Sequence, residues 1–251
     1  MRLGVILGVV CLLGLYGCGG EDEPDANSTA AAAPSGEVMA SRGGPDYGAS
    51  LDDYQDLNAE HSGLVLSYLV LARDSSDQRP SKENLLARLS PRYAQEPDAF
   101  ARKSLVDSEW PAVAAKLNAF ADTSYVKLPV GGELRQVLAL NPPTVGDYSF
   151  EHRGFPLLSY GASCWNAVIR NGGGAVLRVE PGDVPCIVPV GDDDVARRIE
   201  AARASGNLQV KGVLYLFVHD VTQGVASAVP VHYSLEFLDV RAGVSLGTIT
   251  L

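Results

Sequence analysis

The sequence predicts an α+β fold: an N-terminal helical half, residues 51–122, packed with a C-terminal, mostly antiparallel β-sheet that carries one helix, residues 123–251. Two observations lead to this prediction. Apolar residues recur at steps of three and four as far as Phe120, and from Ser124 the step falls to two, which is typical of strands. We expect two subdomains, although residues 51–251 are also short enough to form one domain.

The helical half begins with a predicted helix over residues 51–72, where Leu51, Tyr54 and Leu57 open an apolar pattern of helical spacing. The second part of this helix, LVLSYLVLA, is apolar nearly all round and is predicted to be buried. Ser81 is the predicted N-cap of a shorter helix that ends at Pro91.

Two further helices are predicted before residue 122. One begins at Pro97 and is expected to place Phe100 on its buried side. The other begins at residue 107 or 108. Pro111 falls in the first turn of this last helix, where proline is tolerated. Trp110 lies on its apolar stripe, which indicates a core residue rather than a ligand-binding platform.

The β half is predicted from period-two segments separated by glycine, proline and asparagine. Residues 125–130 and 133–140 are expected to form a hairpin around Gly131-Gly132. Two short apolar stretches follow, at residues 147–150 and 155–158, and shorter predicted strands then cover residues 164–170, 175–180 and 186–190. Residues 195–205 are predicted to form a helix on one face of the sheet, because its apolar side is narrow.

The C-terminal segment has the most regular pattern of the chain. Residues 208–220, 226–239 and 244–250 are predicted strands joined by short turns. In the middle strand apolar and polar residues alternate, so one face of an antiparallel sheet should be buried and the other wet. Residues 213–218 are apolar on both sides, which places the first of these strands at the centre of the sheet.

The first 17 residues have the pattern of an export signal. Arg2 provides a basic start, and an apolar run of about fifteen residues follows, shorter than the roughly twenty that span a bilayer. An acidic segment rich in proline and alanine comes directly after it.

The segment Leu15-Tyr16-Gly17-Cys18 resembles the lipobox of bacterial lipoprotein precursors. The resemblance implies cleavage before Cys18 and lipidation of that residue, which anchors the chain in the bilayer. Gly19 stands where lipoproteins of the inner membrane typically carry Asp, which implies the outer membrane, facing the periplasm. An ordinary signal peptide or an uncleaved anchor is the alternative.

Residues 18–50 are predicted to form a disordered acidic tether behind the lipid, because they lack spaced apolar residues. The net charge of the whole chain is −10, and no basic cluster appears in it. Because nucleic-acid binding needs positive charge opposite the phosphates, the sequence excludes a nucleic-acid partner.

Two of the four cysteines remain once Cys11 is assigned to the signal and Cys18 to the lipid. In an oxidising compartment Cys164 and Cys186 are expected to pair as a disulfide, with two buried free thiols as the alternative. Their spacing does not suggest a zinc site, which needs four ligands in closer sets.

No catalytic, cofactor or metal motif is found. Ser163-Cys164-Trp165 is similar to the nucleophile region of papain-like proteases, but the required glutamine is absent and the chain is too short for the partner histidine. Residues 192–194, three aspartates, lack the glycine and the distal glutamate of a calcium loop. The histidines at positions 61, 152, 219 and 232 form no metal or catalytic motif; His152 is expected to be the most exposed.

Residues 51–251, with their Tyr-Ser-Phe and Phe-Pro-Leu segments, resemble exported bacterial domains of unknown function. This resemblance implies neither an activity nor site residues. The predicted function is therefore a non-enzymatic envelope lipoprotein, with a flexible tether and an envelope protein as its partner. The alternatives are an envelope hydrolase, which requires a deep pocket holding a polar cluster with shifted pKa values, and a small-ligand carrier, which requires a dry cavity between sheet and helices.

Overall fold

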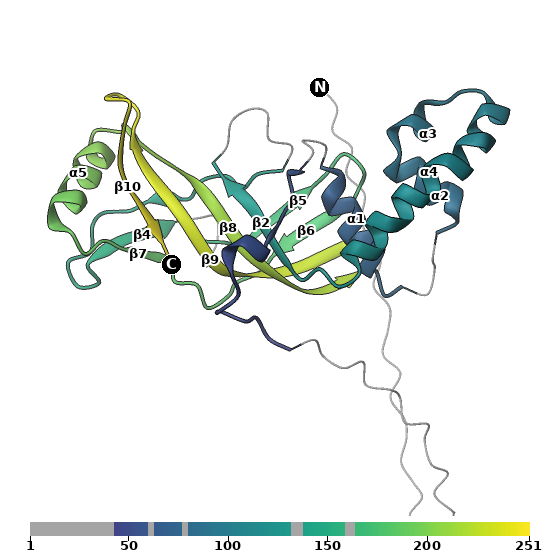
Figure 1. Cartoon of the computed structure of the whole chain (residues 1–251). Helices are drawn as coiled ribbons and strands as arrows, with labels where there is room; N and C mark the ends of the chain where they lie inside the picture. The colour runs from purple at the N-terminus through teal and green to yellow at the C-terminus, as the bar shows by residue number, and fades with distance from the viewer. Residues whose placement is uncertain (1–42, 60–62, 77–79, 132–137, 159–163) are drawn as a thin grey trace, which may run out of the picture. The chain divides into compact units, whose positions relative to one another are not determined.

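The computed structural model describes residues 43–59, 63–76, 80–131, 138–158 and 164–251 (Figure 1). The predicted signal, Cys18 and the tether as far as residue 42 lie outside these ranges. Within them the chain forms five α-helices, a large mixed sheet that is mostly antiparallel, and a small three-stranded sheet. This arrangement confirms the predicted α+β fold.

The large sheet has the strand order β1-β2-β8-β9-β6-β5, and β10 also pairs with β9. Its strands are β1 (Gln55–Asp56), β2 (Tyr125–Val130), β5 (Ala167–Arg170), β6 (Val176–Val179), β8 (Leu208–Thr222), β9 (Val225–Asp239) and β10 (Val244–Thr250). The predicted C-terminal meander β8-β9-β10 is confirmed. β8 is central, as its apolar sequence predicts, because it lies between β2 and β9.

Strand β9 divides one of its edges between two partners. Residues 225–228 pair with β6 in parallel, and residues 234–239 pair with β10 in antiparallel. Pro230 lies between these two segments, where its missing N–H costs no ladder hydrogen bond. The register between β8 and β9 shifts next to the Leu216–Pro230 pair, so the proline lies at a β-bulge.

The small sheet consists of β3 (Thr144–Val145), β4 (Gly154–Leu158) and β7 (Ile187–Pro189), in the order β3-β4-β7. The predicted strand over residues 186–190 is therefore confirmed as β7, and the apolar stretch over residues 155–158 lies in β4. The other apolar stretch, residues 147–150, leads into a turn in which Ser149 and Gly154 make a single bridge. Gly154 fits because its α-carbon lies against the backbone of Val188, where any side chain would collide.

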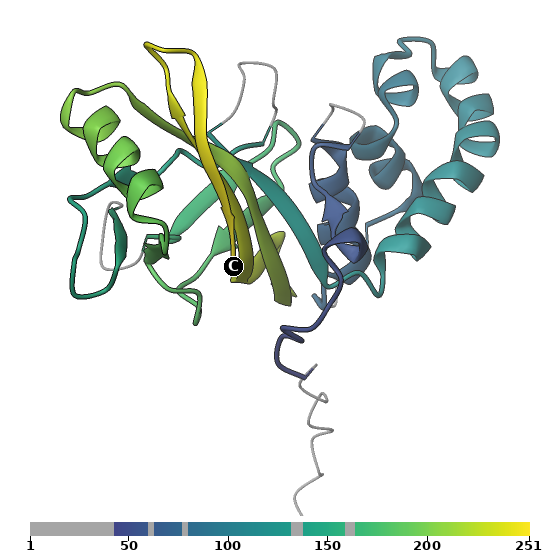
Figure 2. The same ribbon diagram turned by 60° about the vertical axis from the view of Figure 1, so that its left-hand side comes forward.

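Helix α1 (Leu64–Arg73) joins the helical half to the sheet. Leu66 and Leu69 enter the main core, whereas Tyr68 belongs to a second cluster among the helices. That cluster is completed by α2 (Lys82–Leu89), α3 (Pro91–Gln95) and α4 (Ala99–Phe120). In both views these helices lie at the other end of the sheet from α5 (Asp193–Ala204) (Figures 1 and 2).

The first predicted helix is only half correct, because α1 begins at Leu64 rather than Leu51. Residues 51–53 form the short 3-10 turn η1 (Leu51–Asp53), and β1 then pairs in parallel with β2. Tyr54 packs edge-on against Tyr125 and Tyr215, with ring centroids 5.2 and 5.0 Å away. Tyr54, which has the spacing of a helical residue in the sequence, therefore packs on a face of the sheet and is not part of a helix.

Helix α4 replaces the two helices predicted between residues 97 and 122. It is one helix of 22 residues, with Pro111 in its interior and Asp98 as its N-cap. Ser81 caps α2 as predicted, by accepting a hydrogen bond from the Asn84 N–H. The prediction for Phe100 was wrong, because this side chain is 86% exposed. Trp110 packs against the helical cluster, as expected of a core residue.

Residues 43–50 are the described part of the predicted tether, and two of them are hydrogen-bonded to the folded domain. The Asp46 N–H donates to the Tyr125 hydroxyl at 2.7 Å, and the Tyr47 hydroxyl donates to Asp183 at 2.9 Å. The predicted hairpin over residues 125–140 falls partly on residues 132–137, which lie outside the described ranges. The partners of β2 in the sheet are β1 and β8.

Candidate functional site

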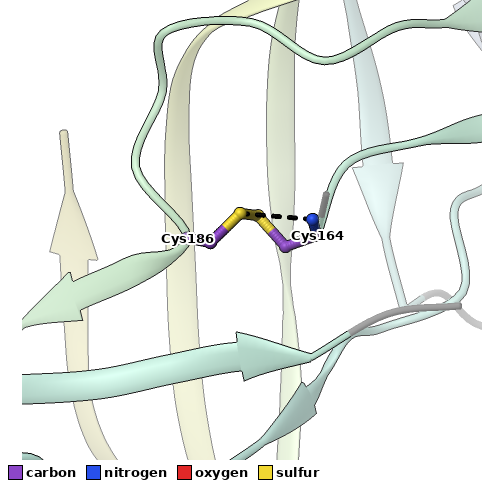
Figure 3. Close-up of a disulfide and its surroundings, with 2 residues drawn as sticks. All are labelled: Cys164 and Cys186. Carbon is purple, nitrogen blue, oxygen red and sulfur yellow. Dashed lines mark hydrogen bonds between the residues drawn. A yellow bond between two sulfur atoms is a disulfide. The ribbon is translucent and has the colours of Figure 1, made fainter. Parts of the chain in front are cut away.

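Cys164 and Cys186 form a disulfide, as the sequence predicts, with sulfurs 2.24 Å apart and α-carbons 5.7 Å apart (Figure 3). The Cys164 N–H donates to the Cys186 sulfur at 3.2 Å. The bond ties the segment before β5 to the start of β7. Because it consumes the Cys164 thiol, the comparison with papain-like nucleophiles has no chemical basis in this fold.

The predicted histidine positions do not meet in one place. His152 is exposed in the turn before β4, as expected, whereas His219 contacts Glu180 at 3.2 Å. His232 lies against the Leu251 carbonyl, 3.2 Å away. His61 lies outside the described ranges. No group of three potential metal ligands occurs among the residues that the structure describes.

An open groove of about 830 Å³ lies between helix α5 and the turn formed by residues 147–153. We call it the α5 groove. Its lining residues are Asp147, Tyr148, Phe150, Arg153, Asp193, Ala196, Arg197, Glu200, Ala201, Arg203 and Ala204. The helical members recur every three or four residues, so the groove follows one side of α5 along its whole length.

Helix α5 has clear start and stop signals. The Asp192 carboxylate accepts hydrogen bonds from the N–H groups of Asp194 and Val195 at 2.8 and 3.0 Å. These backbone bonds lower the pKa of Asp192 and make it the N-cap of α5. Gly206, with φ of 70°, follows the last turn.

The orientation of α5 is set by its narrow apolar side. Ala196, Ile199 and Ala202 are buried, and the helix contacts β8, β9 and β10, as the sequence predicts. Ala201 and Ala204 are left exposed beside them. Small side chains at these positions leave room for the groove.

An aromatic pair forms the opposite wall of the groove. Phe150 is 87% exposed and packs edge-on against Tyr148, with ring centroids 5.2 Å apart. Tyr148 in turn contacts the fully buried Phe155 at 5.1 Å. The wall is therefore supported from the core although its outer ring faces water.

Arg203 and Glu200 form an ion pair with two hydrogen bonds in the groove. Nε and Nη2 of Arg203 donate to the two Glu200 oxygens at 2.9 and 2.7 Å, and Nη2 also lies 2.6 Å from Asp147. Hydrogen bonding from Arg203 lowers the pKa of Glu200, and hydrogen bonding to Glu200 raises the pKa of Arg203. Each shift stabilises the charged form, so the pair is an ion pair and not a proton-transferring acid and base.

A second groove of about 420 Å³ adjoins Arg203 on its other side. It is lined by Pro142, Pro143, Thr144, Val145, Arg203, Gly206, Leu208, Gln209 and Val210. Arg203 is the lining residue that the two grooves share. None of the residues that line the two grooves is predicted as a site residue from the sequence. The Glu200–Arg203 spacing of three on a helix was the one available signal.

No protein-family model matches this chain, and the comparisons with curated proteins and with solved structures found no similar protein.

Proposed function

We propose that the protein is a non-enzymatic envelope lipoprotein that holds an extended segment of a partner protein in the α5 groove. The observation that carries this proposal is the groove itself: it is open, it follows α5 from Asp193 to Ala204, and an exposed aromatic ring, Phe150, lies among its lining residues. Aromatic side chains on the surface are enriched among the residues that dominate protein binding.

The dimensions of the groove suit a peptide segment. Residues 193–204 of α5 extend over about 18 Å, at 1.5 Å per residue. An extended chain rises about 3.3 Å per residue, so roughly five residues of a partner fit alongside the helix.

The chemistry of the groove favours binding over hydrolysis. Its shifted pKa values arise from an ion pair that keeps Glu200 and Arg203 charged. Among the described residues that line the groove there is no serine, cysteine or histidine, and of its carboxylates Asp147, Asp193 and Glu200, the last is held charged by Arg203. The groove also lies between α5 and a turn, and not between sheet and helices, where a small-ligand carrier was expected to hold its cavity.

The proposed anchor is the lipid on Cys18, and the support for it is the lipobox at residues 15–18. Within the described ranges no helix is long and apolar enough to cross a membrane. Near the first described residue, Asp46 and Tyr47 are hydrogen-bonded to Tyr125 of β2 and to Asp183 of the loop before β7. We expect an anchored chain to join the folded domain at these two contacts.

Filling the groove should prevent partner binding. Ala201 is exposed, so Ala201→Trp introduces a large ring into the groove without crowding the core. We expect in-cell cross-linking and purification to recover the partner with the unmodified protein and at least about tenfold less with Ala201→Trp, a loss equivalent to about 1.4 kcal/mol.

The matched control is Ala115→Trp, a substitution of the same kind at an exposed position of α4. It should recover the partner fully, and Cys18→Ser should lose the partner only if anchoring brings the two proteins together. Equal recovery with Ala201→Trp and Ala115→Trp would show that the partner binds elsewhere.

A further inference from the structure

Arg203 lines both grooves, and its guanidinium has two edges that can donate hydrogen bonds. One of these edges has a donor without a partner in the described part of the chain. The side edge, Nε and Nη2, is filled by both oxygens of Glu200. At its outer edge, Nη2 contacts Asp147, and Nη1 has no hydrogen-bond or ion-pair partner among the described residues. A guanidinium edge with two N–H groups fits one carboxylate in bidentate geometry.

Glu200 fixes the orientation of that edge. Its two hydrogen bonds hold the plane of the guanidinium, and the Arg203 side chain is only 24% exposed. A ligand that meets an arginine held in this way loses less side-chain entropy than one that meets a free arginine. The outer edge is therefore preorganised.

Asp147 is a weak occupant of the outer edge. Its side chain is 86% exposed, and one of its oxygens contacts Nη2. An exposed pair of this kind contributes little stability, because water competes for both charges. Asp147 can leave Arg203 and become fully hydrated when a better carboxylate arrives.

We propose that the segment bound in the α5 groove carries a carboxylate, which takes both N–H groups of the outer edge of Arg203 and displaces Asp147. This proposal rests on the proposed function and adds the chemistry of the ligand. The exchange leaves one carboxylate on that edge before and after binding, so it creates no unpaired charge. A basic segment would instead meet Asp147 and Asp193, which are exposed, while Glu200 is already paired with Arg203.

Two small probes differ in the group that matters. N-acetyl-L-phenylalanine has an aromatic ring and a carboxylate, and its amide has the same ring without the charge. We expect the acid to bind the full-length protein in the millimolar range, with shifts in the NMR signals of the Arg203 Nε–H and the Ala204 amide. The amide should bind at least about fivefold more weakly, since it cannot form the charge-assisted pair.

Variants separate this role from a purely structural ion pair. Asp147→Asn removes the internal competitor and should tighten acid binding about threefold, whereas Arg203→Lys keeps the charge, loses the bidentate edge and should abolish the preference for the acid. Asp147 is exposed, so its variant should fold normally.

The carboxylate proposal is overturned if neither probe binds, if acid and amide bind equally, or if the preference survives Arg203→Lys. Equal binding of the two probes would leave the groove as a binding site and remove only its preference for acids. Loss of partner recovery with Ala201→Trp, measured separately, reports on the groove alone.

Discussion

Phe155→Ala is expected to lower the free energy of unfolding by about 4 kcal/mol, the loss usual for a large aromatic core side chain cut back to alanine. Phe155 is fully buried and lies in β4. Its ring contacts Tyr148 at 5.1 Å and Phe237 of β9 at 6.4 Å, so it joins the small sheet to the large one. Urea unfolding followed by circular dichroism measures the loss.

The control for this substitution is Phe100→Ala, at a phenylalanine that is 86% exposed. Because little apolar surface is buried there, its unfolding free energy should change by no more than about 0.5 kcal/mol. Similar losses for the two variants would contradict the assignment of Phe155 to the core. Phe155→Ala should also weaken probe binding, because Tyr148 loses its support from the core.

Replacement of both disulfide cysteines is expected to lower the free energy of unfolding by about 3 kcal/mol, since the cross-link restricts the unfolded chain. The two residues are 22 apart in sequence. Cys164→Ala combined with Cys186→Ala is the informative variant, because Cys164 is buried and alanine places no hydroxyl group there.

Reduction of the unmodified protein with dithiothreitol should produce the same loss as the double alanine variant. The two measurements remove one cross-link by different routes, so they control for each other. An unfolding midpoint that neither treatment shifts would mean that the disulfide constrains nothing in the unfolded state.

Local signals explain which elements the sequence predicts well. Asp192 and Gly206 border α5, and the alternation along residues 229–237 gives β9. Both patterns are complete within a short stretch, so no distant contact has to be known. The disulfide is a similar case, because only two cysteines remain after the N-terminal pair is assigned.

Predictions were wrong where the same spacing of apolar residues fits both a helix and a segment that pairs with a sheet. Tyr54 and Leu57 have helical spacing, yet both are buried in the segment around β1. Gly63, which has a positive φ, is the residue directly before α1. The pairing of β1 with β2 depends on residues about 70 positions away, which no local pattern reports.

The groove was beyond sequence reasoning for a related reason. Asp147 and Arg203 are an ion pair between residues far apart in sequence, and Phe150 is exposed in the turn before β4. From sequence, Tyr148 and Phe150 belong only to a short apolar stretch. Their role beside α5 depends on where the two sheets place the turn.

The central claim is that a partner protein occupies the α5 groove of the anchored protein. The most direct measurement places a photoactivatable phenylalanine at position 150, an exposed phenylalanine that lines the groove, or at position 100, an exposed phenylalanine of α4, as the control, in cells that make the full-length protein. We predict a cross-link to one envelope protein from position 150 and none from position 100. Cross-links to the same protein from both positions, or from position 100 alone, would contradict the account.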